Sequence, residues 1–176
     1  MKEKLFLPKA QNENDLYAQI RDDPRGSRHL EQLEEMWREF RDFAPKGFRR
    51  NFQIAFHQRW WEMYLTLGLL HLGLNIKTSP ADKGPDLCVN INCKRLWIEA
   101  VAPGVGKTSD RVPKSTINGV SDFPKRECLL RLSSQLKDKR DKLAKYIQEG
   151  IIQPGDVCIV SAQPHHLKIS QALRYP

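Results

Sequence analysis

The sequence predicts an α/β protein. Two periodicities lead to this prediction. Apolar residues recur at three- and four-residue steps in three segments of the chain, as in amphipathic helices. Between the second and third of these segments, apolar and polar residues alternate, as in half-buried strands. The chain has 176 residues, of which 40% are hydrophobic, which is enough for a domain with a core of its own.

The N-terminal part is expected to be a helical extension. Residues 1–25 are polar and end in a turn-like sequence, so we expect a loosely ordered lead-in. Residues 27–43 have the apolar period of a helix that ends before Pro45. We therefore divide the chain into an extension, residues 1–50, and a core domain, residues 51–176.

The second predicted helix, residues 51–72, carries one acidic residue in apolar surroundings. Apolar side chains cover this helix nearly all round, which indicates burial. Its acidic residue is Glu62, and a buried carboxylate is costly unless it is paired, hydrogen-bonded or bound to a metal. Arg59 lies one turn earlier and could pair with Glu62. A structural role and a role in a functional site both remain open.

Two more acidic residues lie in the strand-like part of the chain. The predicted strands are residues 74–78, 86–91 and 95–102. A turn at Asn92–Lys94 makes a hairpin of the last two. Asp86 opens the second strand and Glu99 lies inside the third, and the alternation can place both on one face. We interpret Glu62, Asp86 and Glu99 as carboxylates that converge on a metal ion.

A long loop separates the hairpin from the third predicted helix. Residues 103–122 are rich in Pro, Gly and polar residues, and loops of this length are often functional. The loop contains Gly104–Thr108, which resembles part of a phosphate-binding loop. It lacks the first glycine of that motif at the required spacing, so we do not assign the motif.

The third predicted helix, residues 124–149, has a lysine in its apolar stripe. The stripe consists of Leu129, Leu132, Leu136, Leu143 and Ile147. Lys139 falls between its members at helical spacing, so its side chain either extends outward to solvent or meets a carboxylate. Residues 157–160 are then expected to form a short buried strand.

Cysteine and histidine usage gives no metal motif. The four cysteines form no C-x-x-C pair and have no histidine at zinc-site spacing, and we expect Cys88 and Cys158 to be buried thiols. His165 and His166 are interpreted as a loop pair. No apolar run is long enough to span a membrane, and the N-terminus has charge and proline where a signal peptide is apolar. A cytoplasmic protein without a membrane partner is expected.

The net charge of +8 is unevenly distributed. Residues 1–100 carry 16 basic and 14 acidic side chains, whereas residues 101–176 carry 13 and 7. A basic C-terminal half suits a polyanion such as nucleic acid. The alternative is a lysine-rich helix whose charges are simply solvated.

The order of these features resembles the PD-(D/E)xK nuclease superfamily from about Phe52 to Ser161. Pro85–Asp86 is similar to the Pro-Asp of that family, and Glu99, thirteen positions on, is similar to its second acid. Glu62 resembles the helix glutamate that many members carry. The resemblance implies a restriction-endonuclease-like fold, in which helices flank a central mixed β-sheet, here with a helical N-terminal lead-in.

The sequence departs from this family at its lysine. The family's lysine is expected two residues after the second acid, where this chain has Val101. Some members supply the charge from a neighbouring element, and Lys139 is the first candidate here because of its place in the stripe. Lys107 and Lys94 are weaker candidates.

The resemblance implies a metal-dependent nuclease that hydrolyses phosphodiester bonds. Asp86 and Glu99, with a carbonyl of Ala100 or Val101, would hold Mg²⁺ or Mn²⁺. Glu62 would hold a second ion or orient a water, and Lys139 would stabilise charge or help to deprotonate the attacking water. The expected partner is nucleic acid, DNA ahead of RNA, with homodimerisation left open. The expected phosphate contacts are Arg126, Arg131, Lys137, Lys142 and Lys145.

Two other functions remain open. The first is a catalytically inactive nucleic-acid-binding module on the same fold, which the valine at the lysine position favours. The second is a structural or protein-interaction domain whose acids merely pair with Arg59, Arg95 or Lys139.

Overall fold

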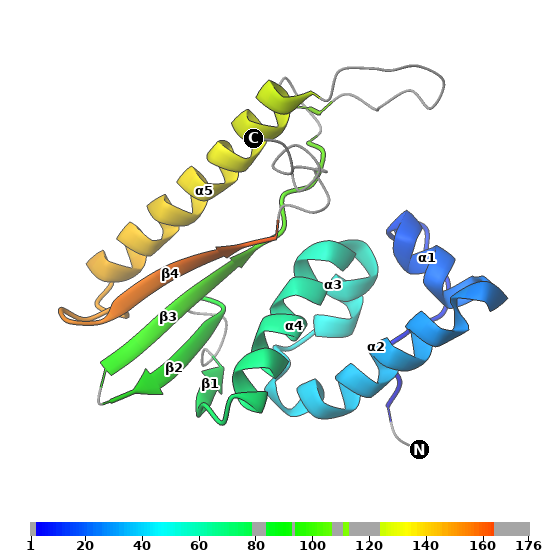
Figure 1. The fold of residues 1–176 in the computed structure, drawn as a ribbon, viewed down its shortest axis with the longest axis horizontal. Coiled ribbons are helices and arrows are strands. Elements are labelled where there is room, and N and C mark those ends of the chain that lie inside the picture. Colours follow the sequence, from blue (N-terminus) through cyan, green and yellow to red (C-terminus); the bar gives the residue numbers. More distant parts are fainter. Residues whose placement is uncertain (1–2, 79–83, 93, 107–110, 113–123, 164–176) are drawn as a thin grey trace, which may run out of the picture.

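The structure is a computed structural model that describes residues 3–78, 84–92, 94–106, 111–112 and 124–163. Lys107, His165 and His166 lie outside these residues, as do Cys93 and much of the long loop. Figure 1 shows the described chain as a mixed α/β fold with one four-stranded sheet. The predicted α/β class is therefore confirmed.

Four helices precede the sheet: α1 (Asp15–Asp22), α2 (Ser27–Phe40), α3 (Phe48–Ile54) and α4 (Phe56–His71). Short 3₁₀ turns at Pro24–Gly26 and Arg41–Phe43 flank α2. The expectation of a loose lead-in is wrong, because Asn14 caps α1 and Tyr17 is fully buried. The single helix expected over residues 51–72 is broken at Ala55, which has a non-helical ψ of 53°.

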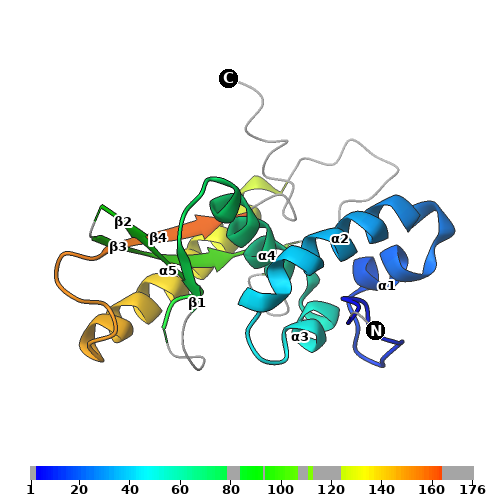
Figure 2. The same cartoon turned by 90° about the horizontal axis from the view of Figure 1, so that it is seen from below.

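An aromatic core joins the N-terminal helices to α4. The rings in contact are those of Phe6, Tyr17, Trp37, Phe40, Phe48, Phe52 and Phe56. Met63 and Leu67 of α4 belong to the same buried cluster. Figures 1 and 2 show α4 between the sheet and the N-terminal helices. The expected division between residues 50 and 51 falls inside α3.

The sheet has the order β1-β2-β3-β4. Its strands are β1 (Ile76–Thr78), β2 (Leu87–Ile91), β3 (Lys94–Val101) and β4 (Val157–Ala162). The pairs β1–β2 and β2–β3 are antiparallel, whereas β3–β4 is parallel, so the sheet is mixed. Asn92, in the turn between β2 and β3, has a positive φ of 47°, which Asn tolerates better than most residues.

The two faces of the sheet contact different helices. Leu87, Val89 and Ile98 form one buried cluster with leucines of α4. Cys88 and Trp97 form another with Leu143 and Tyr146 of α5 (Lys125–Gln148) and with Ile152. The period-two alternation predicted for β2 and β3 therefore separates an α4 face from an α5 face.

The strand expected at residues 157–160 is confirmed as part of β4, but the expectation that it is buried is wrong. Val157 pairs with Leu96 and Ile159 pairs with Ile98, so both lie on the α4 face. They are 46% and 44% exposed, because the leucines of α4 that cover this face pack on β1, β2 and β3. Cys158 is half-buried on the other face, whereas Cys88 is buried as expected.

The apolar stripe expected for α5 is displaced by one position at each end. Leu129 and Ile147 are 44% and 56% exposed. The residue before each of them faces inward instead: Cys128 is buried, and Tyr146 packs on the sheet. Lys139 keeps its place on the sheet-facing side, where it pairs with Glu99 of β3.

A half-buried aspartate ties the start of β3 to the turn before β4. Asp156 accepts hydrogen bonds from Arg95 Nε at 3.0 Å, Trp97 Nε1 at 2.9 Å and the Gln153 backbone N–H at 2.8 Å. Burial raises the pKa of Asp156, but these hydrogen bonds outweigh it, so the pKa lies below its ordinary value. Arg95 therefore pairs with Asp156 and not with one of the three acids singled out above.

We expect Asp156→Asn to lower the free energy of unfolding by about 2 kcal/mol at pH 7, since hydrogen bonds to a charged group are lost. The pKa of Asp156 is lower in the folded state than in the unfolded state, where it is about 3.9, so its ionised form stabilises the fold above that pH. This stabilisation is lost as the pH falls through the folded-state pKa. The difference from wild type should therefore shrink below pH 4 in urea unfolding.

Asp141→Asn, at an exposed pair with Arg140, is the matched control and should change stability by less than about 0.5 kcal/mol. An equal effect of both substitutions would contradict the assignment.

Candidate functional site

Asp86 lies where β2 begins and reaches across to β3. The β2–β3 pairing starts at Leu87 opposite Ile98. Among the described residues, the backbone of β3 beyond Ile98 therefore has no strand partner on this side, and the Asp86 side chain takes that place. Its Oδ2 accepts a hydrogen bond from the Ala100 backbone N–H at 2.8 Å.

Glu99 and Lys139 meet beside Asp86. Glu99 is fully buried on β3, and Lys139 reaches it from α5 and donates a hydrogen bond to its Oε2. The Lys139 Nζ also lies 3.6 Å from Asp86 Oδ2. The structure thus places the ammonium group at both carboxylates, which is one of the two outcomes expected for a lysine in the stripe.

The electrostatics of Glu99 favour a cation beside it. Burial raises the pKa of Glu99, the charge of Asp86 raises it further, and Lys139 opposes both effects. Its second oxygen, Oε1, is buried without a hydrogen-bond partner among the residues that the structure describes. One carboxylate oxygen is therefore bonded to Lys139 and the other is unsatisfied.

Glu62 is buried on α4 and pairs with Arg59, whose Nη1 lies 2.5 Å from Oε2. Burial raises the pKa of Glu62 to about 7, with Arg59 opposing and the charge of Asp86 adding to the shift. The negative charge of Asp86 therefore acts on the carboxylate of Glu62 through space. Within the described part of the chain, no three His, Cys, Asp or Glu side chains are grouped closely enough to hold one metal ion.

Gln58 is a residue of the site that sequence reasoning missed. Its Nε2 donates to the Ala100 carbonyl at 3.0 Å, and its Oε1 accepts from the Ala102 N–H at 2.9 Å. Together with Asp86, Gln58 provides hydrogen-bond partners for the backbone at the end of β3, beyond its pairing with β2. Gln58 lies one helical turn before Glu62, and this pair of polar residues at i and i+4 in an apolar helix is the sequence pattern that could have indicated it.

We expect Gln58→Met, which keeps the side-chain length, to lower the free energy of unfolding by about 1–2 kcal/mol, because it leaves backbone groups of β3 unpaired. Hydrogen exchange should accelerate at the Ala102 amide. The Ala100 amide, which is bonded to Asp86, is the internal control and should change less. Unchanged exchange at Ala102 would show that Gln58 does not hold this strand.

The basic side chains proposed for nucleic acid differ in their surroundings. Arg126, Lys137, Lys142 and Lys145 are exposed on α5, and Lys145 lies 3.6 Å from Glu149. Arg131 is half-buried, and its Nε donates to the Gly104 carbonyl at 3.0 Å, so it ties α5 to the chain beyond β3.

The other lysine candidates do not gain support from the fold. Lys94 opens β3, five residues before Glu99, which is about 16 Å along a strand. It therefore lies at the opposite end of β3 from the site. Val101, at the family's usual lysine position, is buried.

The chain matches no protein-family model, no curated protein and no solved structure. In the part of the chain that the structure describes, every helix is too short or too polar to cross a membrane.

Proposed function

We propose that this chain is a metal-dependent nuclease that hydrolyses phosphodiester bonds, on a restriction-endonuclease-like fold. One observation carries the proposal: Asp86 and Glu99, from neighbouring strands, meet at the ammonium group of Lys139 from the helix that covers them. A mixed sheet with helices on both faces agrees with the proposed fold.

The residues at this point fit a divalent cation. Asp86 and Glu99 offer hard carboxylate oxygens, and Mg²⁺ needs only one or two of these besides water and substrate phosphate. The unsatisfied Oε1 of Glu99 is a buried acceptor that suits a cation. The Ala100 carbonyl is bonded to Gln58, so we assign the site to the two carboxylates alone. Bound there, Mg²⁺ or Mn²⁺ would lower the pKa of a coordinated water and neutralise charge on the phosphate.

The remaining groups have separable roles in this proposal. Lys139 holds a positive charge at the carboxylates and, once released from Glu99, stabilises charge on the phosphate. Glu62, whose pKa lies at about 7, can accept or release a proton near neutral pH. The exposed bases of α5 attract the phosphate backbone, with DNA as the first substrate to test and RNA as the second. Homodimerisation stays open.

Cleavage assays test this function. The protein is stripped with EDTA and incubated with supercoiled plasmid, single-stranded DNA or RNA, with and without millimolar Mg²⁺ or Mn²⁺. We expect cleavage that depends on the metal. Salt-dependent binding without cleavage of any of the three would favour the inactive nucleic-acid-binding module, which Val101 at the lysine position suggests.

A structural or interaction domain is the second candidate, and a specific observation favours it. Glu62 pairs with Arg59, and Asp86 and Glu99 share Lys139, so each acid has a cation within 4 Å. These pairs can exist for stability alone. A melting temperature that does not change with Mn²⁺, together with no binding of nucleic acid, would support this candidate over the nuclease.

A further inference from the structure

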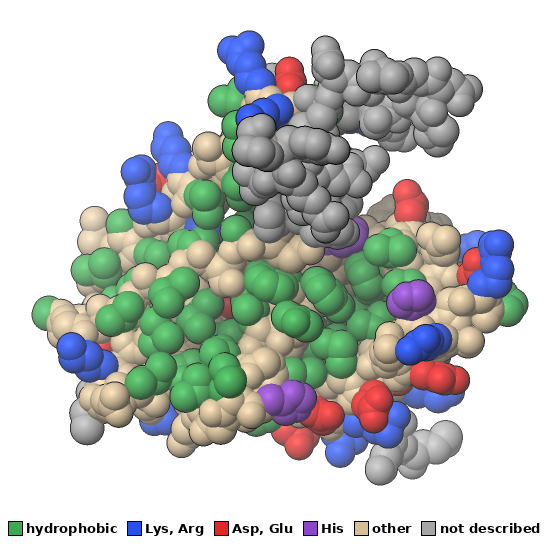
Figure 3. All heavy atoms as spheres, viewed as in Figure 1, with side chains coloured by type: hydrophobic (Ala, Val, Ile, Leu, Met, Phe, Trp, Pro, Cys, Tyr) green, Lys and Arg blue, Asp and Glu red, His purple; other side chains and the backbone are tan. Residues whose placement is uncertain are grey.

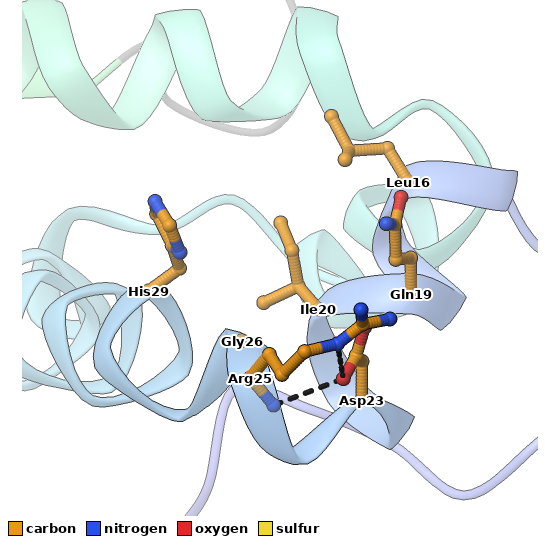
Figure 4. A pocket seen from close by; sticks show the side chains of 7 residues that line it. All are labelled: Leu16, Gln19, Ile20, Asp23, Arg25, Gly26 and His29. Atoms are coloured by element: carbon orange, nitrogen blue, oxygen red, sulfur yellow. Dashed lines mark hydrogen bonds and ion pairs between the residues drawn. The ribbon is translucent and has the colours of Figure 1, made fainter.

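A surface groove runs between α2 and α4 and continues to α1. Two adjoining cavities of about 600 and 560 Å³ share Ile20 and His29, so they form one continuous depression, here called the α2–α4 groove. Figure 4 shows Leu16, Ile20 and His29 pointing into its α1 end, with Arg25 turned toward Asp23 at the border. The groove is distinct from the site at Lys139, because neither Asp86 nor Glu99, its ion-pair partners among the described residues, lines it.

The floor of the groove is apolar and partly aromatic. Leu33 and Leu67 are buried beneath it, and Met36 is half-buried. The rings of Trp60 and Tyr64 stack with centroids 5.3 Å apart, and Tyr64 is 50% exposed. Figure 3 shows hydrophobic side chains gathered on the face seen in Figure 1. Exposed aromatic rings over an apolar floor are typical anchors for a protein partner.

The α2 wall of the groove is acidic, whereas the chain as a whole is basic. Glu35 and Glu39 lie one turn apart on the α2 wall, and both are exposed. Glu39 contacts His71, whose Nε2 is 2.8 Å from Oε2. No Lys or Arg of the described segments forms a salt bridge with either glutamate. Because the whole chain has a net charge of +8, this acidic wall is a local exception, and it would repel nucleic acid.

We propose that the α2–α4 groove binds a cationic amphipathic helix of a partner protein. Carboxylates and aromatic faces together form the chemistry that binds Lys and Arg, the rings through cation–π contact. The apolar side of such a helix would lie on Ile20 and Met36, and its basic residues would meet Glu35, Glu39 and the rings of Trp60 and Tyr64. From His29 to Glu39, α2 rises about 15 Å, which is the length of a ten-residue helix.

Two fluorescein-labelled peptides of about 14 residues test the proposal by anisotropy. They share leucines at helical spacing and carry lysine or glutamate at the other positions. We expect the lysine peptide to bind at least about tenfold tighter than the glutamate peptide. The double variant Glu35→Lys/Glu39→Lys should reverse this preference, and Tyr64→Ala should weaken the lysine peptide about tenfold.

The matched control is Glu31→Lys/Asp42→Lys, which changes the net charge equally at exposed acids outside the groove. It should bind like the wild type, and circular dichroism should show that all variants are folded. A control that loses as much affinity as the groove variant, or a failure of both peptides to bind, would overturn the proposal. A dimer by light scattering that Tyr64→Lys converts to monomer would assign the groove to a second copy instead, which also overturns it.

Discussion

Lys139→Met is expected to lower the free energy of unfolding by about 3 kcal/mol in metal-free buffer. Methionine keeps the length and the apolar contacts of the side chain but removes the ammonium group. Glu99 is then left as a buried carboxylate next to Asp86, and the main cation that opposes burial and the charge of Asp86 is gone. Breaking a buried pair by removing one partner costs far more than removing an exposed charge.

Urea unfolding in EDTA and in millimolar Mn²⁺ measures this effect. If a divalent ion and the ammonium group compete for the same oxygens, Mn²⁺ should stabilise Lys139→Met more than it stabilises the wild type. Lys137→Met, at an exposed lysine on the same helix whose charge is not among those that shift the pKa of Glu99, is the matched control and should change little. A stability loss that Mn²⁺ does not reverse would favour the structural candidate, and an equal loss in the control would remove Lys139 from the site.

Asp86→Asn is expected to reduce the cleavage rate by about 10²–10³ while leaving the fold intact. The amide oxygen of asparagine can still accept the hydrogen bond from the Ala100 N–H, so the backbone of β3 keeps its partner. What is lost is the negative charge, which the proposed metal site needs. The same substitution removes a charge that raises the pKa of Glu99, so that pKa should fall.

Single-turnover cleavage and metal-dependent melting provide the measurements for Asp86→Asn. The Mn²⁺-induced shift in melting temperature should disappear together with the activity. Asp138→Asn, at an exposed acid on α5, serves as the control and should keep both. Full activity of Asp86→Asn would exclude Asp86 as a metal ligand.

The elements that the sequence predicts well are those whose own periodicity fixes them. Strands β2 and β3 lie within one or two residues of their predicted bounds, because alternation over a hairpin leaves one register in which apolar residues share a face. Lys139 could be singled out for a similar reason, since a charge inside an apolar stripe needs a partner. The pairing of Arg59 with Glu62 was accessible because it is local.

Other features depend on contacts that no local pattern contains. Gln58 bonds to backbone atoms 42 and 44 residues away, and the side chain of Asp156 bonds to Arg95 and Trp97, 61 and 59 residues away. The N-terminal segment looked loosely ordered because its sequence is polar, yet Tyr17 is buried with its ring against those of Phe6 and of Phe52 in α3. Tertiary contacts decided these positions.

The position of α4 between two cores has a consequence for how the protein unfolds. One side of this helix contributes Met63 and Leu67 to the aromatic core, and the other contributes Leu65 and Leu69 to the core of the sheet. Neither core can be opened without exposing apolar surface of the same helix. We therefore expect the N-terminal helices and the sheet to melt in one cooperative transition, with no intermediate in which the sheet survives alone. Deleting residues 1–50 would strip α4 of its partners and leave a fragment that aggregates instead of a smaller, working core.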